Sequence, residues 1–190
     1  SPHLKDFIAE HRDLIASDFC INTDTGMLSP TQPTIVYALR GLAYFELHVH
    51  GPKQDLHSGI YGGAVHNPAQ ALAELIAGMH DANGTVTLPG FYDNVRTLDA
   101  EERTELARLP LEADTLIART GVPKLWGEAE FTPTERLGAR PTLEINGMYS
   151  GFIGTGAKTV LPAYAMAKIS CRLVRDQNAA DIKGQLEAYL

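Results

Sequence analysis

The segment from residue 43 to residue 50 alternates strictly between two sets of side chains, and no other feature constrains the fold as strongly. Successive side chains of a β-strand point to opposite faces. This pattern therefore predicts a strand with one face in a core and the other toward water. The inner set is Ala43, Phe45, Leu47 and Val49, and the outer set is Tyr44, Glu46, His48 and His50.

The remaining periodic segments predict a layer of helices over such a sheet. Apolar residues recur at helical spacing from Asn67 to about residue 81, and again over 178–190. Further strands are expected at 142–145, 158–161 and 164–174, whereas 85–140 has weak periodicity and is expected to be an insertion. This order predicts an α+β fold: a two-layer sandwich with a ferredoxin-like antiparallel sheet and helices on one face.

The segment before residue 40 has a different pattern. Residues 2–16 predict a helix, and 19–21 and 34–39 predict short apolar strands. Cys20 and Cys171 each lie in an apolar, strand-like run, so we expect both to be buried free thiols.

Composition excludes some classes of function. A net charge of −7 argues against a nucleic-acid partner, since such surfaces are basic. No run approaches the roughly 20 apolar residues that a membrane span needs, so we expect no membrane partner. The polar first ten residues do not resemble a signal peptide, and we expect a cytoplasmic protein.

The loop at 55–63 carries the most suggestive chemistry. Its sequence, Asp-Leu-His-Ser-Gly-Ile-Tyr-Gly-Gly, places His57 at a corner between a strand and a helix. Histidine can donate or accept a proton near neutral pH, and the glycines allow close approach of the backbone to a ligand. An ordinary surface turn is the alternative interpretation of this loop taken alone.

Three separated motifs together resemble one family. They are the loop at 55–63, Gly-Ala-Lys-Thr-Val-Leu-Pro at 156–162 and Ser-Cys-Arg-Leu-Val at 170–174. In this order they resemble the lid, or dimerisation, domain of the carnosinase-like dizinc metallopeptidases. Their superfamily includes acetylornithine deacetylase and succinyl-diaminopimelate desuccinylase. The resemblance implies a zinc-dependent dipeptidase that hydrolyses a peptide or amide bond and forms a homodimer through this domain.

The resemblance also implies roles for individual residues. His57 matches a lid histidine that stabilises the developing oxyanion in the partner subunit's active site. Arg172 matches an arginine that binds the substrate's carboxylate, and Thr159 matches a substrate-binding position. The 13-residue separation of these two suits neighbouring strands, or a strand and the loop before it. Asp24 matches an aspartate that ligates one of two zinc ions.

The rest of a dizinc site is missing from this sequence, including most of the metal ligands and the general base. We therefore expect residues 1–39 to be a remnant of a zinc-binding catalytic domain. Residues 40–190 would be the lid, without its last strand and with an unpaired sheet edge. Such a fragment is expected to hold few or no zinc ions and to be inactive alone.

Two alternatives remain open at this point. One is an N-acyl amino acid deacetylase or desuccinylase of the same superfamily, and the other is a non-catalytic ferredoxin-like dimerisation module. A separate metal site at His48 and His50 is disfavoured, because strand alternation alone places both outward. Trp126 and Phe131 are expected to anchor the insertion to the lid.

Overall fold

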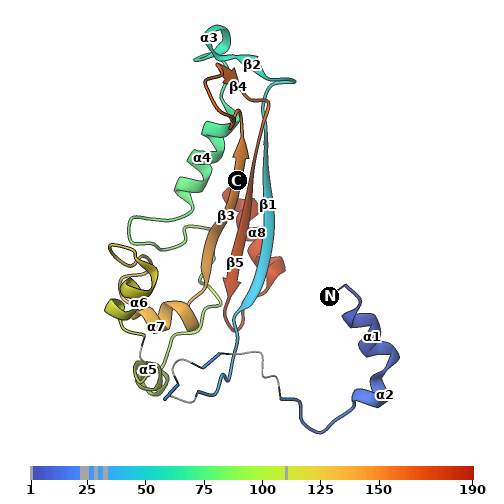
Figure 1. Ribbon diagram of the computed structural model, residues 1–190, viewed down its shortest axis with the longest axis vertical. Helices are drawn as coiled ribbons and strands as arrows, with labels where there is room; N and C mark the ends of the chain where they lie inside the picture. Colours follow the sequence, from blue (N-terminus) through green and yellow to red (C-terminus); the bar gives the residue numbers. More distant parts are fainter. Residues whose placement is uncertain (1, 22–25, 28–29, 32–33, 110) are drawn as a thin grey trace. The chain divides into compact units, whose positions relative to one another are not determined.

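The computed structural model describes residues 2–21, 26–27, 30–31, 34–109 and 111–190 (Figure 1). The chain divides into two compact units, Ser1–Tyr37 and Ala38–Leu190. No helix in the described ranges is both long enough and apolar enough to cross a bilayer.

A three-stranded antiparallel sheet forms the second unit's framework. β5 (Tyr164–Leu173) lies in the middle, with β1 (Gly41–His50) on one side and β3 (Thr142–Ser150) on the other. β1 pairs with β5 without interruption from Gly41 opposite Leu173 to His50 opposite Tyr164. β3 follows β5 with one register shift between Ile145 and Gly147. Within the described part of the chain, β1 and β3 are the two edge strands of this sheet.

Two helices cover the inner face of this sheet. The first, α4 (Pro68–Gly78), begins at Asn67, whose side chain accepts a hydrogen bond from the Ala69 N–H. The second, α8 (Ala179–Tyr189), begins in the same way at Asn178. Leu72 and Ile182 from these helices share one buried cluster with the inner residues of the strands. The cluster's strand members include Ala43, Leu47, Leu143, Ala165, Ala167, Ile169 and Cys171. The predicted α+β two-layer fold is therefore confirmed.

A small structure, which we call the tip, lies at the end of β1 that carries His50. The tip comprises residues 51–63 and 151–162 and contains β2 (Leu56–His57), α3 (Ser58–Tyr61) and β4 (Val160–Leu161). β2 and β4 pair antiparallel, with His57 opposite Val160 (Figure 1). The helix after His57 starts at once, before the glycines, whereas the sequence pattern placed helix only after them.

The insertion contains three helices: α5 (Ala100–Ala107), α6 (Ala113–Thr120) and α7 (Pro133–Gly138). Thr132 and Glu135 form a capping box at the start of α7, and Glu135 also pairs with Arg103 at 3.3 Å. Phe131 packs against the guanidinium of Arg140, 4.1 Å from its ring centre. Trp126 is 66% exposed, so the prediction that it anchors the insertion is wrong.

In the first unit, the predicted helix divides at His11 into α1 (Leu4–Glu10) and α2 (Arg12–Ile15), and neither buries a residue. The described residues of 19–21 and 34–39 form no strand, which contradicts both predictions. Phe19, Ile21 and Ile35 are 87%, 86% and 92% exposed, so these apolar runs lack the covering layer that a buried strand requires.

The two cysteines differ accordingly. Cys20, in the first unit, is exposed, so the prediction that it is buried is wrong. Cys171 is buried as predicted, and burial raises the pKa of its thiol to about 12.

Candidate functional site

At the tip, the structure brings His57 and Thr159 together. The Nε2 atom of His57 lies 3.2 Å from the Thr159 hydroxyl, and both side chains are exposed. The backbone fixes this pair, because the Ser58 N–H donates to the Thr159 carbonyl at 3.0 Å. Asp55 holds the neighbouring turn by accepting a hydrogen bond from the Ala163 N–H at 2.9 Å. Residues separated by about a hundred positions thus form one exposed polar group.

The hydrogen bonds of His57 determine which of its nitrogens can donate. The Gly59 N–H donates to Nδ1 of His57 at 3.0 Å, so Nδ1 is an acceptor and carries no proton. In a neutral imidazole the proton then resides on Nε2. Nε2 therefore presents an N–H donor toward Thr159 and the solvent. This is the polarity needed to stabilise negative charge on an oxygen atom.

Gly59 is required for this arrangement. A Cβ atom at Gly59 would lie 2.8 Å from Cε1 and 3.0 Å from Nδ1 of His57, closer than normal contacts allow. Gly63 has a φ of +83°, in the left-handed region that glycine adopts most easily. The glycines therefore shape the loop around the imidazole.

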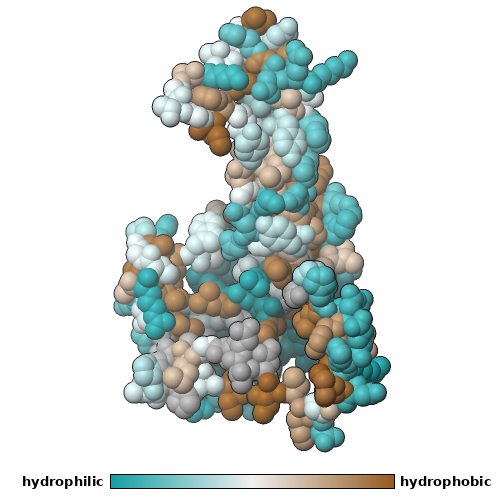
Figure 2. Space-filling model, turned by 45° about the vertical axis from the view of Figure 1, so that its right-hand side comes forward, coloured by the Kyte–Doolittle hydropathy of each residue, from teal (hydrophilic) through white to brown (hydrophobic). Residues whose placement is uncertain are grey.

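The tip also exposes apolar side chains beside its polar group. Ile60 and Ile153 are 72% and 79% exposed, and Tyr61 and Phe152 are also exposed. Figure 2 shows hydrophobic surface among hydrophilic residues around the tip. The tip therefore combines a directed N–H donor with apolar surface available for contact.

Arg172 lies at the opposite end of β5 from the tip. It faces away from the core, opposite Leu42 of β1 and Thr142 of β3. Tyr164, where β5 begins, is eight residues away, which corresponds to about 26 Å at the usual rise of a strand. The structure therefore does not bring Arg172 to His57 and Thr159. Thr159 lies in the connection that leads into β5, and Arg172 lies on β5 itself, as in the expected arrangement of a strand and the loop before it. The two residues are nevertheless far apart, because most of β5 extends between them.

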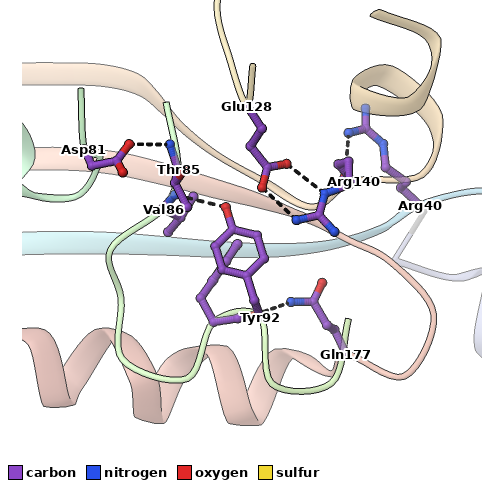
Figure 3. A network of polar contacts seen from close by, with 9 residues as sticks. Arg40, Asp81, Thr85, Val86, Tyr92, Glu128, Arg140 and Gln177 are labelled. Atoms are coloured by element: carbon purple, nitrogen blue, oxygen red, sulfur yellow. Dashed lines mark hydrogen bonds and ion pairs between the residues drawn. The ribbon is translucent and has the colours of Figure 1, made fainter. Parts of the chain in front are cut away.

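A cavity of about 330 Å³ lies beside Arg172, between the insertion and the start of β3. Four arginines line it, Arg40, Arg136, Arg140 and Arg172, and we call them the arginine corner. Glu128 binds Arg140 with two hydrogen bonds of 2.8 and 2.7 Å, and these two side chains are only 10% and 12% exposed (Figure 3). The Glu128 carboxylate therefore balances the charge of Arg140.

The walls of this cavity are tied to the sheet by further polar contacts. The hydroxyl of Tyr92 accepts a hydrogen bond from the Val86 N–H at 3.0 Å (Figure 3). Burial is the main cause that raises the pKa of Tyr92 to about 12. Nη1 of Arg40 donates to the carbonyl of Arg140 at 3.1 Å and more weakly to that of Arg136. Sequence reasoning singled out Arg172 alone, because Arg40, Arg136 and Arg140 match no motif and the contacts of Arg40 join residues 96 and 100 positions apart.

His48 and His50 lie on the outer face of β1, as predicted, with ring centres 6.4 Å apart. Nδ1 of His48 lies 2.7 Å from the Tyr164 hydroxyl, and Nε2 lies 3.3 Å from a Glu46 carboxylate oxygen. Both nitrogens of His48 thus have protein partners. This supports an ordinary polar cluster over a metal site.

No cluster of three or more His, Cys, Asp or Glu side chains suited to a metal ion occurs among the described residues. Asp24, which the resemblance assigns as a zinc ligand, lies outside them. The residues that the structure describes therefore do not fit a zinc centre by themselves.

The second unit is a two-layer α+β domain with an exposed histidine loop, and comparison with known proteins identifies its family. Residues 37–190 match the family described as "Peptidase dimerisation domain". The chain belongs to this family of M20 peptidases.

Individual relatives agree with this assignment. The chain is 33% identical over 193 residues to the Cys-Gly metallodipeptidase dug1 of Schizosaccharomyces pombe, covering 100% of this chain and 40% of that protein. It is 30% identical to the human Beta-Ala-His dipeptidase, covering 98% of this chain and 37% of the relative. The chain thus spans about two fifths of the length of these two dipeptidases.

Solved structures give the same result. The crystal structure of human carnosine dipeptidase 1 matches with a TM-score of 0.83 and 29% identity, covering 98% of this chain and 40% of that one. An M20 family metallo-carboxypeptidase from Sulfolobus solfataricus matches with a TM-score of 0.82 and 32% identity, covering 98% and 48%. The fold is therefore that of an M20 dimerisation domain.

Proposed function

We propose that this chain supplies the lid and dimerisation domain of a zinc-dependent dipeptidase that works as a homodimer. In this proposal His57 serves the partner subunit's active site, and Arg172 binds the carboxylate of the substrate. The hydrogen bond from the Gly59 N–H to Nδ1 of His57 carries the proposal, because it leaves Nε2 as a donor. Both of these relatives are named as dipeptidases, which favours peptides over N-acyl amino acids as substrates.

His57 would act on the carbonyl of the bond that is cleaved. Negative charge grows on that oxygen as the carbonyl carbon is attacked, and the Nε2–H of His57 would donate to it. In the free protein this N–H points to the Thr159 hydroxyl at 3.2 Å, which the substrate oxygen would replace or join. Removal of one such donor typically slows an enzyme by about 10²–10³-fold.

Arg172 would bind the terminal carboxylate through its planar guanidinium, which can donate two parallel hydrogen bonds. A zinc ion would activate the attacking water when bound. Asp24 would be one of its ligands, and the described residues do not supply a set of others. No role in the chemistry falls to the insertion in this proposal.

Action across a dimer follows from the length of β5. An extended dipeptide spans only about 7 Å, whereas Arg172 lies about 26 Å from the start of β5 nearest the tip. One chain therefore cannot place its own His57 and Arg172 on one dipeptide. Two chains can do so, if the tip of one approaches the arginine corner of the other.

Mixing two inactive variants of the full-length protein tests this arrangement. Mixed dimers of His57→Ala and Arg172→Ala subunits contain one site with both residues intact and one with neither. We expect co-expression to restore about a quarter of the wild-type activity, because half of the dimers are mixed and each has one intact site. No recovery in mixed dimers confirmed by tagging would show that both residues serve the same chain.

Two further assays separate the alternatives. Comparison of dipeptides with N-acyl amino acids distinguishes a dipeptidase from a deacetylase or desuccinylase. Absence of turnover with either class would favour a non-catalytic dimerisation module. The 190-residue chain alone is expected to be inactive, and measurable turnover by it with added zinc would contradict that expectation.

A further inference from the structure

The arginine corner has more positive charge than its surroundings balance. Four guanidinium groups line the cavity, whereas two carboxylates, Glu128 and Glu144, also line it. Glu128 forms an ion pair with Arg140, whereas Glu144 forms no ion pair within 4.0 Å among the described residues. Arg40, Arg136 and Arg172 likewise have no carboxylate within ion-pair distance in the described part of the chain. The chain as a whole has a charge of −7, so this local excess of positive charge is opposite in sign to the net charge of the chain.

Two of these arginines are held in place without being neutralised. Carbonyl groups of Arg136 and Arg140 accept hydrogen bonds from Arg40. Among the described residues no carboxylate forms an ion pair with Arg40, and the charge of Glu144 acts on it only from a distance. Burial, and then the nearby charge of Arg172, lower the pKa of Arg40. Arg136 donates to the Trp126 carbonyl at 3.1 Å, and its buried Nε has no hydrogen-bond partner among the described residues. A buried donor without a partner is unfavourable, so Arg136 keeps unused hydrogen-bonding capacity at the wall of the cavity.

We propose that this cavity binds a small ligand with two carboxylates. Arg172 binds one of the carboxylates, and Arg40 and Arg136 bind the other. A volume of 330 Å³ is at the lower end of the usual range for small-molecule sites, about 300–1,000 Å³. Guanidinium groups suit this ligand, because their planar donors match the two oxygens of a carboxylate. Tyr92 and Trp126 supply aromatic surface for its carbon chain.

Within the proposed function, on which this step rests, the ligand is the C-terminal residue of the substrate. Arg172 would take the terminal carboxylate, and Arg40 and Arg136 would take the side chain of a C-terminal aspartate or glutamate. The inference thus gives the dipeptidase a preference for peptides that end in an acidic residue. Arg40 and Arg136 belong to none of the three sequence motifs. The preference for an acidic residue therefore depends on the arginine corner and not on the motifs.

Binding is measured first on the 190-residue chain, by calorimetry with glutarate as the dicarboxylate and butyrate as the monocarboxylate. We expect glutarate to bind more tightly, and Arg136→Gln to weaken glutarate binding by about tenfold or more, as expected for a lost charged hydrogen bond. Arg119→Gln is the matched control, because Arg119 is exposed on α6 and lies away from the cavity. Equal affinity for the two acids, or equal weakening by both substitutions, would overturn the proposal.

A second variant, Arg136→Lys, keeps the proposal testable if Arg136→Gln does not fold. Arg136→Lys keeps the charge and loses the planar fork, so we expect glutarate binding between that of the wild type and Arg136→Gln. Circular dichroism and the thermal midpoint show whether each variant is folded. If Arg136→Gln does not fold, glutarate binding by Arg136→Lys that equals wild type would overturn the proposal.

Kinetics on the full-length protein then test the link to the substrate. We expect kcat/KM to be higher for Ala-Glu than for Ala-Gln, and Arg136→Gln to reduce this ratio about tenfold while sparing Ala-Gln. Cleavage of both peptides without a preference would refute the inference and leave the dipeptidase proposal intact. Glutarate binding without cleavage of any dipeptide would refute the dipeptidase proposal alone.

Discussion

The tip and the arginine corner lie at opposite ends of β5 and are built in opposite ways. The tip is exposed, contains two-residue strands, and is fixed by a few local hydrogen bonds. The corner is partly buried and is fixed by charged side chains from the insertion and from one end of the sheet. This difference suggests that the tip is built to contact another surface, whereas the corner is built to hold charge in place.

The largest expected effect is at the tip and concerns activity alone. His57→Ala in the full-length protein should lower kcat/KM by about 10²–10³-fold, because it removes the Nε2–H donor. The thermal midpoint should change little, because His57 is exposed. His66→Ala is the control, since His66 is a largely exposed histidine of a nearby loop, paired with Glu74. A similar loss of kcat/KM in the two variants would contradict a specific role for His57.

The next effect is at the corner and concerns stability. Glu128→Ala leaves the Arg140 guanidinium without its partner, and should lower the free energy of unfolding by about 2–3 kcal/mol. Urea denaturation of the 190-residue chain measures this. Glu105→Ala removes an exposed pair with Arg108 and should cost less than about 1 kcal/mol. Equal losses of unfolding free energy in the two variants would mean that the Glu128–Arg140 pair contributes no more than an exposed surface pair.

A smaller and local effect is expected for Asp55→Ala at the tip. The change removes the acceptor for the Ala163 N–H, a net contribution of about 1 kcal/mol at most. Hydrogen exchange of this amide should become about fivefold faster, with amides of β5 unchanged. Lys53→Ala, an exposed neighbour in the same loop, should leave the amide unaffected. Faster exchange throughout β5 would show that the tip and the sheet open together.

The smallest effect lies between the two ends, at the exposed pair of Glu46 and Lys168. Hydrogen bonding to Lys168 lowers the pKa of Glu46, so this carboxylate stabilises the fold above its unfolded-state pKa. The contribution is lost as the pH falls through the folded-state pKa. Lys168→Gln should return the NMR titration of Glu46 toward the ordinary value for glutamate. An unchanged titration would exclude Lys168 as the cause.

Local patterns in the sequence predict much of the second unit. Alternation predicted β1, helical spacing and Asn caps predicted α4 and α8, and glycine chemistry predicted a corner at His57. The arginine corner could not be predicted, because the contacts of Arg40 join residues 96 and 100 positions apart. The strands expected at 19–21 and 34–39 failed for a related reason. Apolar runs become buried strands only when another layer covers them, and a short pattern contains no information about that layer.

The Nδ1 atom of His57 has two roles, since it accepts the Gly59 N–H that starts α3 and thereby sets the donor at Nε2. Protonation of Nδ1 would turn this acceptor into a donor, so an imidazolium at position 57 would lose the hydrogen bond from the Gly59 N–H. Loop geometry and hydrogen-bond polarity are therefore coupled through one atom. Protein engineers who wish to alter the reach of this loop would have to preserve a hydrogen bond that lies within three consecutive residues.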